Sequence, residues 1–226
     1  MFFVFFVSLW FNTDHQEAKT VSFGKGKAAQ LLTELIEERL RAGSDVEAID
    51  QKIWSMLGEE WAVLCSDMSG FSRRTEEFGI IHFLSLIHEM HKLMKPVLLA
   101  HNGMLIKEEA DNLFVIFRDP KQAIHCALDM HRATIRYNEN KTTDYQIAVC
   151  IGIGFGKILK LGDEDCFGSE INLSFKLGED IAGPRETLLT HSAYEALRGL
   201  KDLRIETTST DKTGLFSEIY KVILPE

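Results

Sequence analysis

The alternation of apolar and polar stretches along the chain predicts a mixed fold of helices and strands. Apolar residues recur at helical spacing in two stretches near the N-terminus, 28–42 and 45–57. Beyond residue 58, short apolar runs typical of strands alternate with longer amphipathic stretches typical of helices. The expected strands are 61–66, two within 102–117, two within 145–162, 187–190, 202–208 and 215–223. The expected helices are 76–100, 120–137, 170–181 and a short one from Ser192.

This order of elements predicts an α+β fold. Strands and helices follow one another as βαββαβ and then as αβαββ. The first six elements are typical of a ferredoxin-like unit, in which an antiparallel sheet carries helices on one face. The glycines of "IGIGFG" (151–156) favour a bend between two strands. We expect a main domain at 59–226 and an N-terminal helical extension at 1–58.

Composition and charge exclude several classes of protein. The chain has 226 residues, 45% of them apolar, which is enough for one sizeable core. Its net charge of −9 argues against general binding of nucleic acid, which needs a cationic surface. The four cysteines form no CxxC pair, and three lie in or beside apolar runs. We therefore expect reduced, buried cysteines in a cytoplasmic protein rather than disulfides or a zinc site.

The first eleven residues, "MFFVFFVSLWF", are strongly apolar. They are too short to span a bilayer and lack the basic residues of a secretory signal. We favour a terminal segment that packs on the core or on a partner, or a start codon assigned too early. Membrane association through residues 1–11 is left open as the alternative. The polar residues 12–27 read as a linker.

Two aspartates are the first candidates for chemistry. Asp67 follows the apolar run "WAVLC" (61–65), and Asp111 lies in the turn "ADN" between the next two strands. In a βαββαβ sheet the first and third strands are antiparallel neighbours, so both carboxylates are expected at one end of the sheet. Carboxylates held together in this way repel one another unless a cation lies between them. Each aspartate alone is more often an ordinary turn or capping residue.

Four motifs in order resemble the catalytic domain of the class III nucleotidyl cyclase family. They are "CSDMSGFS" (65–72), "NGMLIKEEADNLFVIF" (102–117), "IGIGFGKILKLG" (151–162) and "DCFGSEINLSFKLGEDIA" (165–182). The resemblance covers roughly 61–223. It implies an adenylate or guanylate cyclase, which converts a nucleoside triphosphate to its 3′,5′-cyclic monophosphate and pyrophosphate. It also implies two divalent metal ions, Mg²⁺ or Mn²⁺, and sites formed between the two chains of a homodimer.

The resemblance also assigns expected roles to individual residues. Asp67 and Asp111 match the metal-binding aspartates, and Met68 would add its backbone carbonyl. Lys107 and Asp165 match the pair that reads adenine, which indicates ATP as the substrate. Asn172 matches the residue that positions the ribose, and Lys176 stands where the family usually has a transition-state arginine. The remaining expected contacts with the nucleotide are Gly70, Phe71 and, by a weak alignment, Lys212.

Departures from the family pattern leave alternatives open. Lys176 keeps the positive charge of arginine but not its planar fork, which predicts a slower enzyme. Ala110 replaces the usual glycine before the second aspartate. The alternatives are a weak or inactive module for nucleotide sensing or dimerisation, and a guanylate cyclase. His82, His88 and His91 show no third ligand and are not expected to hold a metal. Residues 176–183 are expected to shape a helix end rather than to supply a catalytic acid.

Overall fold

The computed structural model describes residues 22–70, 76–200, 203–208, 216 and 218–224, so the apolar segment 1–11 lies outside it. The α-helices are α1 (Lys27–Arg39), α2 (Val46–Leu57), α4 (Ile80–Ala100), α5 (Pro120–Asn138), α6 (Ser169–Phe175) and α7 (His191–Leu197). A 3₁₀ turn, η1 (Thr143–Tyr145), and a π-helical turn, η2 (Lys176–Ile181), complete the helical elements. The strands are β1 (Gly58–Met68), β2 (Met104–Glu109), β3 (Asn112–Phe117), β4 (Val149–Leu161), β5 (Asp165–Phe167), β6 (Thr187–Leu189), β7 (Arg204–Thr208) and β8 (Ile219–Ile223).

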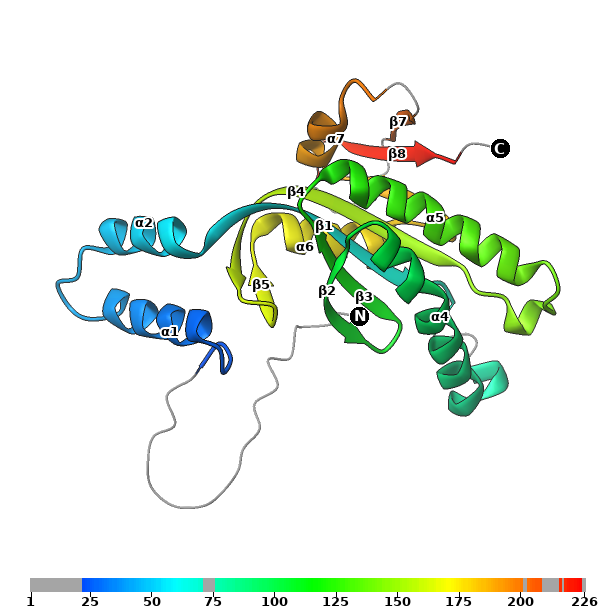
Figure 1. Cartoon of the computed structure of the whole chain (residues 1–226), viewed down its shortest axis with the longest axis horizontal. Coiled ribbons are helices and arrows are strands. Elements are labelled where there is room, and N and C mark those ends of the chain that lie inside the picture. Colours follow the sequence, from blue (N-terminus) through cyan, green and yellow to red (C-terminus); the bar gives the residue numbers. More distant parts are fainter. Residues whose placement is uncertain (1–21, 71–75, 201–202, 209–215, 217, 225–226) are drawn as a thin grey trace, which may run out of the picture.

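The strands form one sheet in the order β2-β3-β1-β4-β6-β8-β7, with β5 paired to β4 (Figure 1). The first four strands have the antiparallel ferredoxin-like order, which confirms the α+β prediction. Strand β1 lies between β3 and β4 and is buried from Trp61 to Ser66. It extends beyond the predicted 61–66 at both ends, because residues 58–60 and 67–68 also pair with β4.

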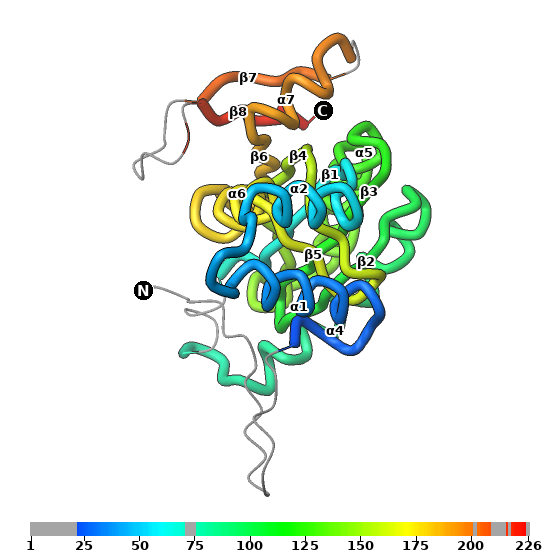
Figure 2. Tube along the Cα trace, turned by 90° about the vertical axis from the view of Figure 1, so that its left-hand side faces the viewer, coloured from blue at the N-terminus to red at the C-terminus, as the bar shows by residue number. Residues whose placement is uncertain are grey.

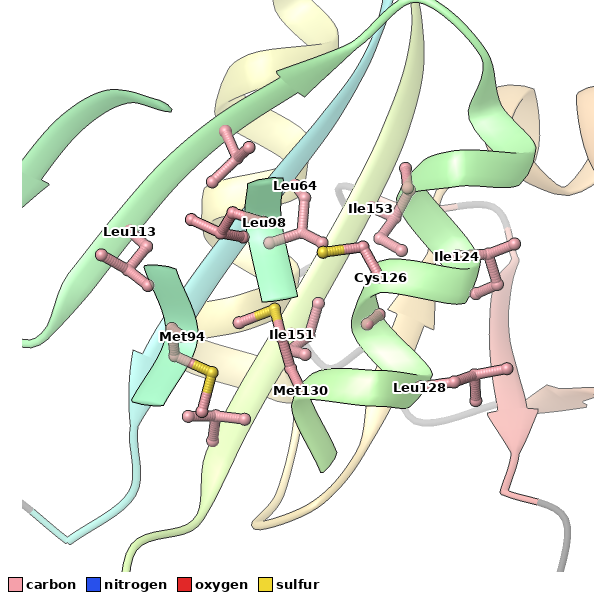
Figure 3. Close-up of a cluster of buried hydrophobic side chains, with 14 of the residues drawn as sticks. Leu64, Met94, Leu98, Leu113, Ile124, Cys126, Leu128, Met130, Ile151 and Ile153 are labelled. Carbon is pink, nitrogen blue, oxygen red and sulfur yellow. The ribbon is translucent and has the colours of Figure 1, made fainter. Parts of the chain in front are cut away.

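Side chains cover both faces of the sheet. One face carries α4, α5 and α7, and its core contains Leu64, Leu113 and Ile151 (Figure 3). The other face carries α6, whose Ile171 packs against Val63 and Phe114. The prediction of helices on one face of the sheet therefore holds for the ferredoxin-like unit. It does not hold for the whole domain, because α6 and η2 cover the second face of the sheet.

Strand β4 is continuous, so the predicted glycine bend is wrong. Its glycines clear space for α6 and η2 instead of turning the chain. A Cβ atom on Gly152 would lie 2.0 Å from the Ser174 carbonyl oxygen, and one on Gly154 would lie 2.5 Å from Ser174 Oγ. Glycine thus lets the helical segment approach the strand backbone closely.

The N-terminal helices α1 and α2 form a hairpin that leads directly into β1 (Figure 2). Asp45 caps α2 by accepting a hydrogen bond from the Ala48 backbone N–H at 3.1 Å. The facing sides of the two helices bury Leu32, Leu35 and Ile53 together with Leu161 of β4. The helical pair therefore packs on one end of the sheet.

Three further features bear on the sequence predictions. The predicted helix 76–100 is interrupted at Gly79, which has a φ of +84° and precedes α4. The four cysteines are all buried and unpaired, as expected from their apolar surroundings. Within the described part of the chain, no helix combines the length and apolarity needed to cross a bilayer.

Candidate active site

Asp67 and Asp111 meet at one end of the sheet. Asp67 is the penultimate residue of β1, and Asp111 lies in the two-residue turn between β2 and β3. The antiparallel pairing of β1 with β3, in register Ser66 to Leu113, brings this turn beside the end of β1. Ala110 adopts a φ of +52° in the turn, in the left-handed region that favours glycine. Backbone pairing between strands distant in sequence therefore holds the two carboxylates together, as predicted.

The electrostatics of this pair are unfavourable without a counter-charge. Burial, then the charge of Asp111 and a hydrogen bond with it, raise the pKa of Asp67 to about 8. Burial also raises the pKa of Asp111, a residue that is only 7% exposed. Glu179 adds a further negative charge that acts on Asp67. The pair therefore retains a proton at a pH where isolated aspartates are ionised.

The donor set of this site fits a hard divalent cation. Asp111 Oδ2 is buried and has no hydrogen-bond partner in the structure. Oxygen ligands of this kind are those that Mg²⁺ and Mn²⁺ take in proteins. Among the described residues, no cluster of three or more His, Cys, Asp or Glu side chains is arranged to hold a metal. Further ligands would therefore come from backbone or amide oxygens, or from the substrate.

Lys107 and Asp165 form the second part of the site, and the structure joins them directly. Lys107 Nζ donates a hydrogen bond to Asp165 Oδ2 at 2.8 Å, from β2 to β5. The other oxygen, Asp165 Oδ1, accepts from the Cys166 backbone N–H at 2.8 Å. One residue thus presents a donor and the other an acceptor, both partly exposed. Their separation of 58 residues in the sequence makes this contact a result of the fold.

Asn172 and Lys176 lie one helical turn apart, where α6 continues into η2. Asn172 is exposed, and Lys176 is half-buried. Lys176 Nζ donates to Asp180 Oδ2 at 2.6 Å. The ammonium group of Lys176 is therefore held by a carboxylate on its own segment, with one third of its side chain still exposed.

The other predicted residues have mixed outcomes. Gly70 lies two residues after the end of β1 with a φ of +92°, a conformation that glycine adopts without strain. Met68 is 1% exposed, so its side chain belongs to the core and its backbone alone is available as a ligand. Phe71 and Lys212 lie outside the described residues.

Two residues beside the aspartates were not singled out from the sequence. Asn112 Nδ2 donates to Glu179 Oε1 at 2.7 Å, and Asn112 Oδ1 is buried without a hydrogen-bond partner. The segment 176–181 does end a helix, as predicted, and it also places Glu179 beside the site. The contact between Asn112 and Glu179 spans 67 residues and gives no local signal in the sequence.

His91 of α4 also lies near the aspartates. Its Nε2 atom is buried without a hydrogen-bond partner, and the charge of His91 acts on Asp111.

Comparisons with known proteins identify the fold. No protein-family model matches the chain. The crystal structure of the guanylyl cyclase Cya2 superposes with a TM-score of 0.61 at 18% identity, over 73% of this chain and 91% of that chain. The adenylyl cyclase CyaB from P. aeruginosa superposes with a TM-score of 0.60 at 21% identity, over 75% of this chain and 96% of that chain. The chain has the class III nucleotidyl cyclase fold.

A curated relative supports this likeness at the level of sequence. The protein named "Putative adenylate cyclase 3" from Rhizobium meliloti (strain 1021) is 25% identical over 142 residues, or 63% of this chain. The matched region spans 24% of that protein, so the chain corresponds to about a quarter of its length. Both adenylyl and guanylyl cyclases have the class III fold, so the fold alone leaves the nucleotide base open.

Proposed function

We propose that this protein is an adenylate cyclase that converts ATP to 3′,5′-cyclic AMP and pyrophosphate. The observation that carries the proposal is the convergence of Asp67 and Asp111 at the sheet end of a class III cyclase fold. Carboxylates that are held close and partly desolvated in this way support the binding of divalent cations. Their burial makes a purely structural role costly, because a buried carboxylate without a cation or a donor is destabilising.

Asp67 and Asp111 would hold two divalent ions, with the Met68 carbonyl as a further ligand. When bound, the ions supply Lewis acidity toward the ribose 3′-hydroxyl and neutralise charge on the phosphate oxygens. Gly70 leaves backbone N–H groups free to approach the phosphates, because it has no side chain. Asn172 would position the ribose, and Lys176 would offset the negative charge that develops at the α-phosphate.

Lys107 and Asp165 would select the base. Adenine presents an acceptor at N1 and a donor at its N6 amine. Lys107 would donate to N1 and Asp165 would accept from N6. Guanine presents the reverse pattern, a donor at N1 and an acceptor at O6, which would leave both side chains without a partner. The pair already formed in the protein keeps the donor and the acceptor side by side.

The complete site would need two protomers. We infer that Asp67 and Asp111 come from one chain, and that Lys107, Asp165, Asn172 and Lys176 come from its partner. A C₂ homodimer would then contain two equivalent sites. The hairpin of α1 and α2, which packs on the sheet end through Leu161, would influence the angle between the protomers.

The direct test is product formation. Purified protein incubated with ATP and Mn²⁺ is expected to release cyclic AMP and pyrophosphate in equal amounts, measured by chromatography. Addition of EDTA should stop the reaction, and dilution below the dimer dissociation constant should lower the specific activity. ATP that stays intact with a dimeric, ATP-binding protein would contradict the proposal and favour the nucleotide-sensing module.

A second prediction concerns Lys176. The variant Lys176→Arg is expected to raise kcat for ATP by about 3–10-fold, because a guanidinium can contact two phosphate oxygens at once. Lys176→Ala should lower kcat by about 100-fold, through loss of a positive charge that would oppose the transition-state charge. Steady-state kinetics at saturating ATP and Mn²⁺ provide the measurement. A wild-type kcat in Lys176→Ala would remove this residue from the site.

Specific observations keep two other functions in view. Lysine in place of the family's arginine favours a slow or non-catalytic nucleotide sensor, which binding without turnover would reveal. The structural likeness to guanylyl cyclase Cya2 keeps GTP as a second substrate candidate. Competition between ATP and GTP in one reaction separates the two cyclase activities.

A further inference from the structure

Asn112 stands directly beside the metal-binding aspartates. It is the first residue of β3 and follows Asp111 in the chain. The β1–β3 pairing ends with Cys65 to Phe114 and Ser66 to Leu113, and the same register extended by one residue places Asn112 opposite Asp67. Directly opposed residues of an antiparallel pair have Cβ atoms about 5 Å apart on the same face of the sheet. That face is the one covered by α6 and η2, because Cys65 and Phe114 have the same alternation and pack there.

The orientation of the Asn112 amide is fixed by Glu179. Asn112 Nδ2 donates to Glu179 Oε1 at 2.7 Å, so Oδ1 points away from Glu179. Asn112 Oδ1 is buried and accepts no hydrogen bond. The same is true of Asp111 Oδ2 on the preceding residue. Buried acceptor oxygens without donors, on two consecutive residues, call for an electropositive partner. Amide oxygens are ordinary ligands of hard divalent cations.

Glu179 is held in place by the packing of η2. A Cβ atom on the preceding residue, Gly178, would lie 2.8 Å from the Cys65 carbonyl oxygen, so the π-helical turn rests directly on β1. This close backbone packing sets the distance between the Glu179 backbone and the end of the sheet. Glu179 itself is exposed, and its Oε1 accepts from the amide.

We propose that the Asn112 carboxamide oxygen is a further ligand of a divalent cation held by Asp67 and Asp111, and that Glu179 positions this amide. The inference rests on the proposed function, since it uses the same metal site. Glu179 acts on the cation through Asn112, as outer-shell carboxylates act on the ligands that they orient. The ligand set of the site then combines two carboxylates with one oriented amide oxygen.

The test measures Mn²⁺ binding in the absence of nucleotide. The full chain is titrated with Mn²⁺, and free Mn²⁺ is followed by its electron paramagnetic resonance signal. Glu179→Ala is expected to raise the Kd by about 10–100-fold, the usual range for lost outer-shell support, and Asn112→Ala, which removes the ligand itself, by at least as much. Glu179→Gln retains an acceptor for the amide and should stay within about threefold of wild type.

Glu109→Gln is the matched control. Glu109 is exposed, and its charge acts on Glu179, so the variant removes one nearby negative charge without touching the amide contact. Its Kd is expected within about threefold of wild type, since exposed charges are screened. Thermal unfolding of each variant checks that the fold is kept.

Two results would overturn the inference. One is wild-type Mn²⁺ affinity in both Asn112→Ala and Glu179→Ala. The other is an equal loss of affinity in Glu109→Gln and Glu179→Ala, which would reduce the role of Glu179 to net charge. A cyclic AMP assay on the same samples keeps the two proposals apart. If the wild type forms no cyclic AMP but the variants show the predicted Mn²⁺ affinities, the cyclase function is contradicted and the ligand assignment is supported.

Discussion

Replacing Asp67 by asparagine is expected to abolish cyclic AMP formation and to stabilise the metal-free protein. Activity should fall by about 10³-fold or more, because the loss of one ligand removes the charge stabilisation that the ions provide. The gain in stability has a separate cause. In the metal-free fold, Asp67 lies against Asp111 and within reach of the charge of Glu179, and asparagine removes that repulsion.

The effect on stability depends on pH with a defined sign. The pKa of Asp67 is about 8 in the folded protein, above its ordinary value of 3.8. The folded state therefore binds more protons than the unfolded state between those values, and stability falls as pH rises through this window. Because Asp67 is only half-buried, water screens part of this repulsion, and we expect the free energy of unfolding to be lower by about 1–2 kcal/mol at pH 8. The Asp67→Asn variant should lack this fall.

Urea denaturation at pH 5 and pH 8, with and without Mn²⁺, measures both effects. Mn²⁺ should stabilise the wild type at pH 8 and have little effect on Asp67→Asn, because only the intact site binds the ion tightly. The control is Asp163→Asn, an aspartate with a 79% exposed side chain in the turn between β4 and β5. Equal stability of wild type and Asp67→Asn at pH 8 would contradict the proposed repulsion.

The sequence predicted those parts of the site that depend on the order of strands. Asp67 and Asp111 could be placed together because a βαββαβ order makes the first and third strands neighbours. The contact between Lys107 and Asp165 was anticipated only through the family resemblance. Asp165 lies on β5, a three-residue strand that was not predicted, because so short a pairing leaves no periodic pattern.

The errors and omissions arise from packing that no local pattern reveals. The glycines of β4 are typical of a bend, yet Gly152 serves the close approach of the Ser174 carbonyl. Glu179 was overlooked because its position depends on η2. A π-helical turn advances differently from an α-helix, so the 3.6-residue period does not predict which face its residues take. The pairing of Glu179 with Asn112 therefore follows from tertiary structure alone.

Exchanging the hydrogen-bonding roles of Lys107 and Asp165 is expected to change the base preference. The wild type should favour ATP over GTP by about 10²-fold or more in kcat/KM, because each hydrogen bond to a charged group contributes about 1.5–3 kcal/mol. In Lys107→Glu/Asp165→Asn, the glutamate accepts from guanine N1–H and the asparagine amide donates to O6. The ratio should move toward GTP by about 10³-fold, from two bonds of that size.

The choice of asparagine follows from the contacts of Asp165. Its Oδ1 accepts from the Cys166 N–H, and asparagine keeps that oxygen while it turns an N–H₂ donor toward residue 107. Lys107→Glu alone would place two carboxylates face to face and should lower both activities. Glu108→Gln is the control, since Glu108 pairs instead with Lys95 of α4 at 3.1 Å. An unchanged ratio of ATP to GTP turnover in the double variant, with activity retained, would mean that other residues read the base.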